Sequence, residues 1–211
     1  MAGEGRIRVL SEKAVGLLIA RAETIAVAES LTGGLLAAAL TSVPGASAVF
    51  RGGVVAYATD LKAALLGVPS ALLDRHGPVH PAVAAAMAEG SRARMDAAVG
   101  AATTGVAGPE PADGQPVGTV HIAVSSSGGT ATRALSLTGD RHEIRLSTVE
   151  QALGLLIGVL GEEEPMITAL RQWTRGDALS RTVREDRYGG GVSGSASGRE
   201  CGDGPASPLA R

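Results

Sequence analysis

The stretch TIAVAESLTGG, residues 24–34, decides the fold prediction. Its first part is a short apolar run with β-branched residues, which is typical of a buried β-strand. Small residues follow from Gly33 to Leu40, and they predict a helix that the pair Pro44-Gly45 ends. The polar residues in between, beginning with Ser30, therefore form a strand-to-helix turn. In an open α/β sheet such turns lie at the carboxyl ends of the strands, where ligands bind.

Strands and helices alternate through most of the chain. Three residues that cap helices well, Asp60, Ser70 and Asp140, mark expected helix starts. The pair Gly128-Gly129 separates two strand-like runs and predicts a hairpin. The expected strands are residues 24–28, 49–58, 96–103, 118–126 and 130–137, and the expected helices are residues 11–21, 33–40, 60–66, 70–75, 80–95 and 140–160. This order predicts an α/β fold, a three-layer α/β/α sandwich with a mixed, mostly parallel sheet.

The sequence changes character after Gly161. Residues 1–161 have the pattern of one globular domain, and 211 residues are too few for a second large one. Residues 162–211 form a C-terminal extension, in which one short amphipathic helix is expected around Met166 to Trp173. Gly, Ser and Pro then dominate, so we expect the extension to be largely disordered from about residue 177.

The composition excludes several classes of function. A net charge of −2 and an aromatic content of 2% argue against a nucleic-acid partner, which needs basic faces or stacking platforms. Charged residues from Glu4 to Lys13 interrupt the N-terminal sequence, so no signal peptide is expected. No uninterrupted apolar stretch reaches about 18 residues, so no membrane span is expected. A reducing cytoplasm fits best, because Cys201 is the only cysteine.

Ser30 and Lys62 are candidates for a catalytic pair. Tyr57 closes one expected strand and Lys62 lies in the first turn of the next helix, so both can face the sheet edge that carries Ser30. Each residue has a simpler alternative. Ser30 or Thr32 could only cap the following helix, Lys62 could be a solvated surface lysine, and Tyr57 a half-buried strand residue.

Two further segments offer substrate contacts. Thr104 precedes GVAGP, residues 105–109, where Gly105 and Gly108 would let backbone approach a ligand closely. Arg141 opens the last helix, and its guanidinium suits a phosphate. The alternatives are a plain turn and a surface arginine beside a helix cap. The four histidines lack carboxylates at ligand spacing, so no metal is expected.

Five motifs in a fixed order resemble the C-terminal domain family of the competence- and damage-inducible protein CinA. The resemblance covers roughly residues 9–160. Position 31 is Leu where many members have Cys. Residues 110–115 also depart from the family pattern, and we expect this second difference to alter substrate fit. The motifs are AESLTGG at 28–34, GGVVAY at 52–57 with Lys62 and LGV at 66–68, GVAGP at 105–109, PVGTV at 116–120, and GDR at 139–141 with Arg145.

The resemblance implies a nicotinamide-nucleotide amidase, also called an NMN deamidase. Such an enzyme hydrolyses the carboxamide of nicotinamide mononucleotide (NMN) to nicotinate mononucleotide and ammonia, in pyridine-nucleotide recycling. It implies a serine–lysine pair at Ser30 and Lys62. We also expect no cofactor and a homo-oligomer, namely a dimer. Two alternatives stay open: a non-catalytic nucleotide-binding module, and a serine–lysine amidase for another carboxamide.

A lysine can act as a base only when it is neutral. Its reference pKa of about 10.4 must fall by about 3 units for it to be neutral near neutral pH. Burial supplies shifts of this size. We therefore predict that Lys62 is desolvated beneath the Ser30 turn, with Nζ within about 2.6–3.2 Å of Ser30 Oγ.

The remaining candidates have roles around this pair. We expect backbone N–H groups at the turn, or near Gly105, to hold an oxyanion. The assignments are Thr32, Gly33, Gly34 and Gly105 for the oxyanion or substrate, Tyr57 for relaying a proton or fixing Lys62, Thr104 for a hydrogen bond to Lys62 or substrate, and Arg141 for the 5′-phosphate.

Overall fold

The apolar run after Thr24 forms strand β1, Ile25–Glu29, and all of its residues are buried. The computed structural model describes residues 2–162. β1 belongs to a five-stranded sheet with the order β2-β1-β3-β4-β5. The other strands are β2 (Phe50–Val55), β3 (Val99–Gly105), β4 (Thr119–Ser126) and β5 (Gly129–Ser136).

The sheet is mixed, as predicted. β1 is parallel to both β2 and β3, whereas β4 is antiparallel to β3 and β5 is antiparallel to β4. β4 therefore runs antiparallel to the other four strands. It forms the predicted hairpin with β5. The carboxyl ends of β1, β2 and β3 meet at one edge of the sheet, and this edge carries the Ser30 turn.

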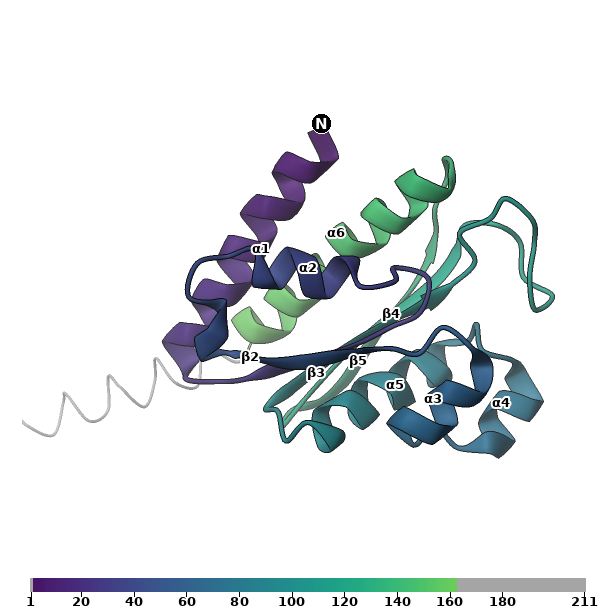
Figure 1. Cartoon of the computed structure of the whole chain (residues 1–211), viewed down its shortest axis with the longest axis horizontal. Coiled ribbons are helices and arrows are strands. Elements are labelled where there is room, and N and C mark those ends of the chain that lie inside the picture. Colours follow the sequence, from purple (N-terminus) through teal and green to yellow (C-terminus); the bar gives the residue numbers. More distant parts are fainter. Residues whose placement is uncertain (1, 163–211) are drawn as a thin grey trace, which may run out of the picture. The chain divides into compact units, whose positions relative to one another are not determined.

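Helices cover both faces of the sheet (Figure 1). Ile25 and Val27 of β1 face one apolar cluster, and Ala28 faces the other. The predicted three-layer α/β/α sandwich is confirmed. One face carries α1 (Ala2–Arg21), α2 (Leu35–Thr41) and α6 (Arg141–Glu162); the other carries α3 (Thr59–Leu66), α4 (Ser70–His76) and α5 (Pro81–Arg94); a short 3-10 helix, Ala46–Ala48, precedes β2.

The first helix is longer than predicted, since α1 begins at Ala2 and not at Ser11. Gly5 in its first half lowers helix propensity by about 1 kcal/mol relative to alanine, which masks the helix in the sequence. Packing overrides this cost. Ile7 is buried in the core, and Arg6 forms an ion pair with Glu150 of α6 at 3.0 Å.

Other boundaries also shift. β2 ends at Val55, so Tyr57 lies beyond the strand, and β3 begins at Val99 because Asp96 adopts a φ of 49° after α5. Asp60 and Ser70 do not cap their helices, since the N-caps are Ala58 and Pro69.

Asp140 does cap α6. Its Oδ1 accepts from the Glu143 N–H at 2.8 Å, and Glu143 Oε2 accepts from the Asp140 N–H at 2.8 Å, which is a reciprocal capping box.

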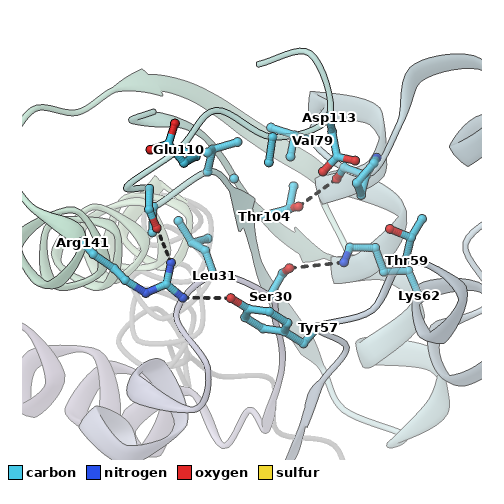
Figure 2. A pocket seen from close by; sticks show the side chains of 16 residues that line it. Ser30, Leu31, Tyr57, Thr59, Lys62, Val79, Thr104, Glu110, Asp113 and Arg141 are labelled. Carbon is cyan, nitrogen blue, oxygen red and sulfur yellow. Dashed lines mark hydrogen bonds between the residues drawn. The ribbon is translucent and has the colours of Figure 1, made fainter. Parts of the chain in front are cut away.

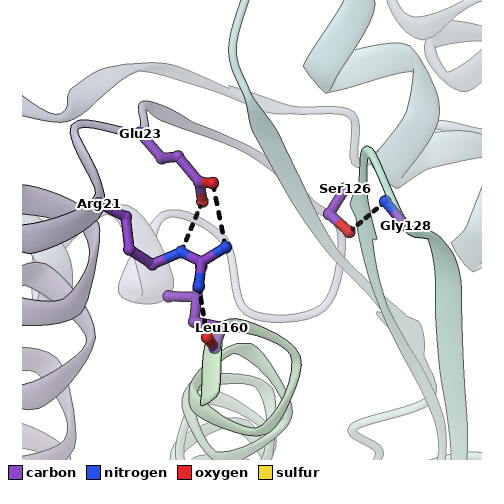
Figure 3. Close-up of polar contacts among 5 residues, drawn as sticks. All are labelled: Arg21, Glu23, Ser126, Gly128 and Leu160. Atoms are coloured by element: carbon purple, nitrogen blue, oxygen red, sulfur yellow. Dashed lines mark hydrogen bonds and ion pairs between the residues drawn. The ribbon is translucent and has the colours of Figure 1, made fainter. Parts of the chain in front are cut away.

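α6 is long and apolar enough over Arg141–Gly161 to qualify as a membrane span by length and composition, with a mean hydropathy of 1.3. Its apolar side chains, such as Ile144 and Leu156, belong to the core cluster shared with α1 and the sheet. Figure 3 shows how its end is fixed. Arg21 donates to the Leu160 carbonyl oxygen at 2.8 Å and pairs with Glu23. α6 is thus built as a core helix of this domain. The predictions for the amphipathic segment and the disordered tail lie outside residues 2–162.

Candidate active site

Ser30 lies directly after β1, at the sheet edge where the sequence places it. Its N–H donates to the Thr103 carbonyl oxygen at 3.0 Å, which continues the β1–β3 pairing by one residue. The side chain is 8% exposed. This nearly buried residue at a strand end lines a cavity.

Lys62 projects from α3 beneath this turn and is 1% exposed, so its predicted burial is confirmed. Its Nζ lies 3.2 Å from Ser30 Oγ and donates to the Ala56 carbonyl oxygen at 2.8 Å. The Ser30 distance lies at the upper end of the reach that a base requires. The Ala56 carbonyl oxygen orients the amine. Because it is a backbone atom, no side-chain pattern in the sequence predicts this contact.

The surroundings of Lys62 favour its neutral form. Burial lowers the pKa of Lys62 below its ordinary value, while the negative charge of Asp113 raises the pKa and opposes this effect. Lys62 is also the fourth residue of α3, and the partial positive charge of a helix N-terminus disfavours a nearby ammonium group. A desolvated amine beside a hydroxyl is an arrangement that can activate a nucleophile.

A cavity of about 180 Å³ opens over Ser30 and Lys62. Figure 2 shows the two side chains at its base, with Tyr57 and Arg141 at one side and the loop between β3 and β4 above them. Four of the sequence-predicted residues therefore join Ser30 and Lys62 around one pocket: Tyr57, Thr104, Gly105 and Arg141.

Gly33 and Gly34 do not line the pocket, contrary to the prediction. Both have positive φ, 59° and 98°, so glycine at these positions serves the backbone conformation of the turn. The Gly33 N–H donates to the Ser30 carbonyl oxygen at 3.1 Å, and the Gly34 N–H donates to Glu29 at 2.9 Å. Neither N–H is left to bind an oxyanion or a phosphate.

Glu29 is a structural residue that was not predicted from the sequence. Its side chain is buried, and its carboxylate accepts three backbone N–H groups of the turn and of α2, from Gly34, Leu36 and Ala37, at 2.9, 3.1 and 2.8 Å. The protein thereby places its own anion at the start of α2, where a substrate phosphate was a candidate. A carboxylate at the end of an otherwise apolar buried strand is the signal that could have revealed this, because it must find donors.

Replacing Glu29 with glutamine should lower the free energy of unfolding by about 2–3 kcal/mol, since charge-assisted bonds are lost and the amide NH₂ faces backbone donors. Urea denaturation of the purified protein measures this change. Glu12→Gln is the matched control, because Glu12 is exposed and its ion pair with Arg8 is long, at 3.8 Å. Equal stability of Glu29→Gln and wild type would contradict the role given to this carboxylate.

Thr32 also has a structural place and does not line the pocket. Its hydroxyl lies 2.7 Å from that of Thr103, and its side chain is fully buried. Arg145 donates to the carbonyl oxygens of Leu31 and Thr32, at 3.0 and 2.8 Å. These contacts fix the turn from behind. The N–H groups of Leu31 and Thr32 have no acceptor within residues 2–162. Leu31 lines the pocket and Thr32 does not, so the Leu31 N–H is the turn donor that remains for an oxyanion.

Tyr57 makes no hydrogen bond to Lys62, which corrects one of its predicted roles. Its side chain is 58% exposed, and its hydroxyl accepts from Arg141 Nη2 at 2.9 Å. Arg141 Nη1 donates to the Gly108 carbonyl oxygen at 2.6 Å. Tyr57 and Arg141 thus form one wall at the mouth of the pocket.

Thr104 lines the pocket, but its hydroxyl donates to the Pro78 carbonyl oxygen at 2.8 Å and not to Lys62. Its oxygen keeps a lone pair for a substrate donor. Gly105 also lines the pocket. A Cβ there would lie 2.5 Å from the Thr119 carbonyl oxygen, so close packing against β4 requires glycine. Within residues 2–162 no group of three or more His, Cys, Asp or Glu side chains is arranged to hold a metal ion.

The sequence matches the family described as the CinA C-terminal domain over residues 7–160. It is 56% identical over 142 residues to a CinA-like protein of Frankia casuarinae, covering 67% of this chain and 33% of that protein. It is 49% identical over 155 residues to a CinA-like protein of Anaeromyxobacter dehalogenans, covering 73% and 38%. The chain therefore spans about a third of the length of these curated relatives.

Solved structures agree with the sequence match. The competence/damage inducible protein CihA of Agrobacterium tumefaciens is 37% identical, with a TM-score of 0.71 and coverage of 74% of this chain and 96% of that one. A competence-damaged protein (CinA) superfamily protein of Escherichia coli is 34% identical, with a TM-score of 0.71 and coverage of 72% and 90%. The expected resemblance is confirmed, and this chain belongs to the CinA C-terminal domain family.

Proposed function

We propose that this protein is a nicotinamide-nucleotide amidase that hydrolyses the carboxamide of NMN by serine–lysine catalysis, in the cytoplasm. The observation that carries the proposal is the buried contact of 3.2 Å between Lys62 Nζ and Ser30 Oγ at the base of the pocket. A capping serine and a solvated lysine need no such contact. Phosphate binding alone also needs no desolvated lysine, which favours an enzyme over a nucleotide-binding module.

In the first half of the reaction, neutral Lys62 accepts the Ser30 hydroxyl proton while Oγ attacks the carboxamide carbon. One N–H of the amine stays on the Ala56 carbonyl oxygen, so its lone pair can face Ser30. The C–N bond then breaks, and Lys62 returns its proton to the leaving NH₂ group. Ammonia departs, and the acyl group remains as an ester on Ser30.

In the second half, water attacks the ester carbon and Lys62 accepts one of its protons. The Ser30–acyl bond breaks, and the same proton returns to Ser30 Oγ. The product is nicotinate mononucleotide, and the pair is ready for another cycle. In both halves the N–H group of Leu31 is the candidate donor for the oxyanion, because Thr32 does not line the pocket and Glu29 and Ser30 occupy the N–H groups of Gly34 and Gly33.

We assign Arg141 to the 5′-phosphate of the nucleotide. It lies at the mouth of the pocket, at some remove from the Ser30–Lys62 pair, and its guanidinium makes hydrogen bonds to two uncharged groups, the Gly108 carbonyl and the Tyr57 hydroxyl. No carboxylate of residues 2–162 neutralises this guanidinium through an ion pair, so a phosphate can pair with it.

Replacing Arg141 with alanine should raise KM for NMN about 10-fold with little change in kcat, because a phosphate contact distant from the reacting carbon serves binding. The dephosphorylated nucleoside is the matched substrate control, since the same variant should change its kcat/KM less than about 2-fold. Initial rates of ammonia release on both substrates measure this. An equal loss on both would show that Arg141 holds the pocket wall and not the phosphate.

The proposal is tested directly by ammonia release from NMN by the purified protein, with nicotinate mononucleotide identified as the second product. Binding of NMN without ammonia release would favour a nucleotide-binding module. Release from other carboxamides but not from NMN would leave a serine–lysine amidase with a different substrate. The oligomeric state, for which a dimer is expected, is measured on the same preparation.

A further inference from the structure

Two carboxylates line the same pocket as Ser30 and Lys62, and the reaction above does not use them. Glu110 and Asp113 belong to the loop between β3 and β4. Figure 2 shows them on the side of the pocket opposite Ser30. Within residues 2–162 neither carboxylate has a hydrogen bond or an ion pair, so both remain free to meet a ligand.

The loop holds Asp113 in a defined place. Asp113 and Gly114 both have positive φ, 54° and 71°, and they form the tip of a two-residue turn. Ala112 and Gln115 close this turn with backbone hydrogen bonds in both directions, at 3.2 and 2.9 Å. The Asp-Gly pair is typical of this turn type. The carboxylate is thus presented to the pocket by a formed turn.

The charges of the pocket are unbalanced when Lys62 is neutral. Two carboxylates then face one guanidinium, that of Arg141. Aromatic side chains are the other common means of holding a cation. Within residues 2–162, Tyr57 is the single aromatic residue that lines the pocket. A ring nitrogen that carries an alkyl group and a positive charge has no N–H to donate, so carboxylates can recognise it through charge alone.

We propose that Glu110 and Asp113 select carboxamides carried on a cationic ring, such as an N-alkylpyridinium, and that the bound cation completes the activation of Lys62. The inference rests on the proposed function and names the substrate class of that site. The second part follows from Asp113, whose charge raises the pKa of Lys62 against the lowering by burial. A cation beside Asp113 cancels this effect, and Lys62 then loses its proton more readily.

The first experiment compares NMN with its 1,4-dihydro form, which has the same phosphate and carboxamide but a neutral ring. The double variant Glu110→Gln, Asp113→Asn should lower kcat/KM for NMN about 30-fold and change that for the dihydro form less than about 3-fold. Asp74→Asn, at an exposed position of α4, is the matched control and should change neither. An equal fold-loss on both substrates would overturn the inference while leaving the amidase proposal intact.

The second experiment does not depend on NMN. p-Nitrophenyl acetate acylates an activated serine, and Ser30→Ala supplies the background. In Asp113→Asn the pKa of Lys62 falls further, so more of the lysine is neutral at pH 7. Acylation should be about 3-fold faster than in wild type, with its pH midpoint moved downward. Within residues 2–162, the other titratable groups that line the pocket are those of Tyr57, Glu110 and Arg141. Asp60 lies on α3, the helix that carries Lys62.

The opposite changes expected in NMN hydrolysis and in ester acylation distinguish charge selection from damage to the pocket. A variant that loses NMN hydrolysis while gaining ester acylation fits charge selection, because a damaged pocket would lose both. Slower acylation in Asp113→Asn, or an unmoved pH midpoint, would overturn the link to Lys62. If wild type is acylated as expected but releases no ammonia from NMN, the proposal that NMN is the substrate fails. Charge selection can then be tested by whether ligands protect Ser30 from acylation. An N-methylpyridinium carboxamide that protects Ser30 no better than nicotinamide would overturn charge selection as well.

Discussion

Replacing Ser30 with alanine should lower kcat/KM for ammonia release from NMN at least about 10⁴-fold, or roughly 5.5 kcal/mol of transition-state stabilisation. The proposed reaction forms its covalent bond at Oγ, and alanine has no atom there. Lys62 would stay in place on the Ala56 carbonyl oxygen, but with no hydroxyl to deprotonate. Steady-state ammonia release at high enzyme concentration measures the residual rate.

The fold should survive this change. The Ser30 side chain has one hydrogen bond within residues 2–162, with Lys62, and the backbone bond to Thr103 does not involve the side chain. The free energy of unfolding should change by less than about 1 kcal/mol, and NMN should still bind. Ser47→Ala is the matched control, because Ser47 is exposed and distant in the fold. Residual activity above about 1% in Ser30→Ala would exclude Ser30 as the nucleophile.

Much of the fold is predictable because local and global signals agree. TIAVAESLTGG combines an apolar strand, a glycine turn and a small-residue helix, and the structure has this order. The hairpin follows from two strand-like runs around Gly128-Gly129. The first half of α1 was not predicted, because local sequence signals do not indicate it. Its first half gains stability from packing on α6, and the contact of Ile7 with the core cannot be read from local propensity.

The candidate site also has a part that the sequence predicts and a part that it does not. Ser30, Lys62 and Arg141 reach one pocket because each follows a strand end or begins a helix at the same sheet edge. Their partners are backbone atoms such as the Ala56 carbonyl oxygen, which carry no side-chain signature.

Gly33 and Gly34 were assigned wrongly for a physical reason. A helix N-terminus attracts an anion, but the sequence alone does not say whether that anion is a ligand or, as here, Glu29.

Replacing Lys62 with methionine should lower kcat/KM for NMN about 10³-fold, because no base remains for Ser30. Methionine keeps an unbranched apolar chain in the buried space, so the fold should persist. Lys13→Met is the matched control, since Lys13 is exposed on α1. In wild type, kcat/KM should rise with pH through the lowered pKa of Lys62, as neutral amine forms. Lys62→Met should lack this rise.

Stability gives an independent measure of the same pKa. The unfolded chain has a lysine pKa of about 10.4, whereas burial lowers the pKa of Lys62 in the folded protein. Between these two values the unfolded chain binds the proton that the folded protein has released, so the free energy of unfolding of wild type rises with pH. Below the folded pKa, wild type bears the full penalty of a buried ammonium group. The free energy of unfolding of Lys62→Met should therefore exceed that of wild type most at low pH, and this difference should shrink as the pH rises toward about 10.4.

Lys62→Arg separates a base from a mere positive charge. Arginine stays protonated at every accessible pH, so it can stabilise a negative charge but cannot accept the Ser30 proton. The variant should be as inactive as Lys62→Met, and its kcat/KM should not rise with pH. Because a larger charged group in this buried place could disturb the fold, NMN binding and the unfolding transition are measured with it. Substantial activity in a folded Lys62→Arg protein would mean that Lys62 acts as a cation, and proton transfer from Ser30 would need another acceptor.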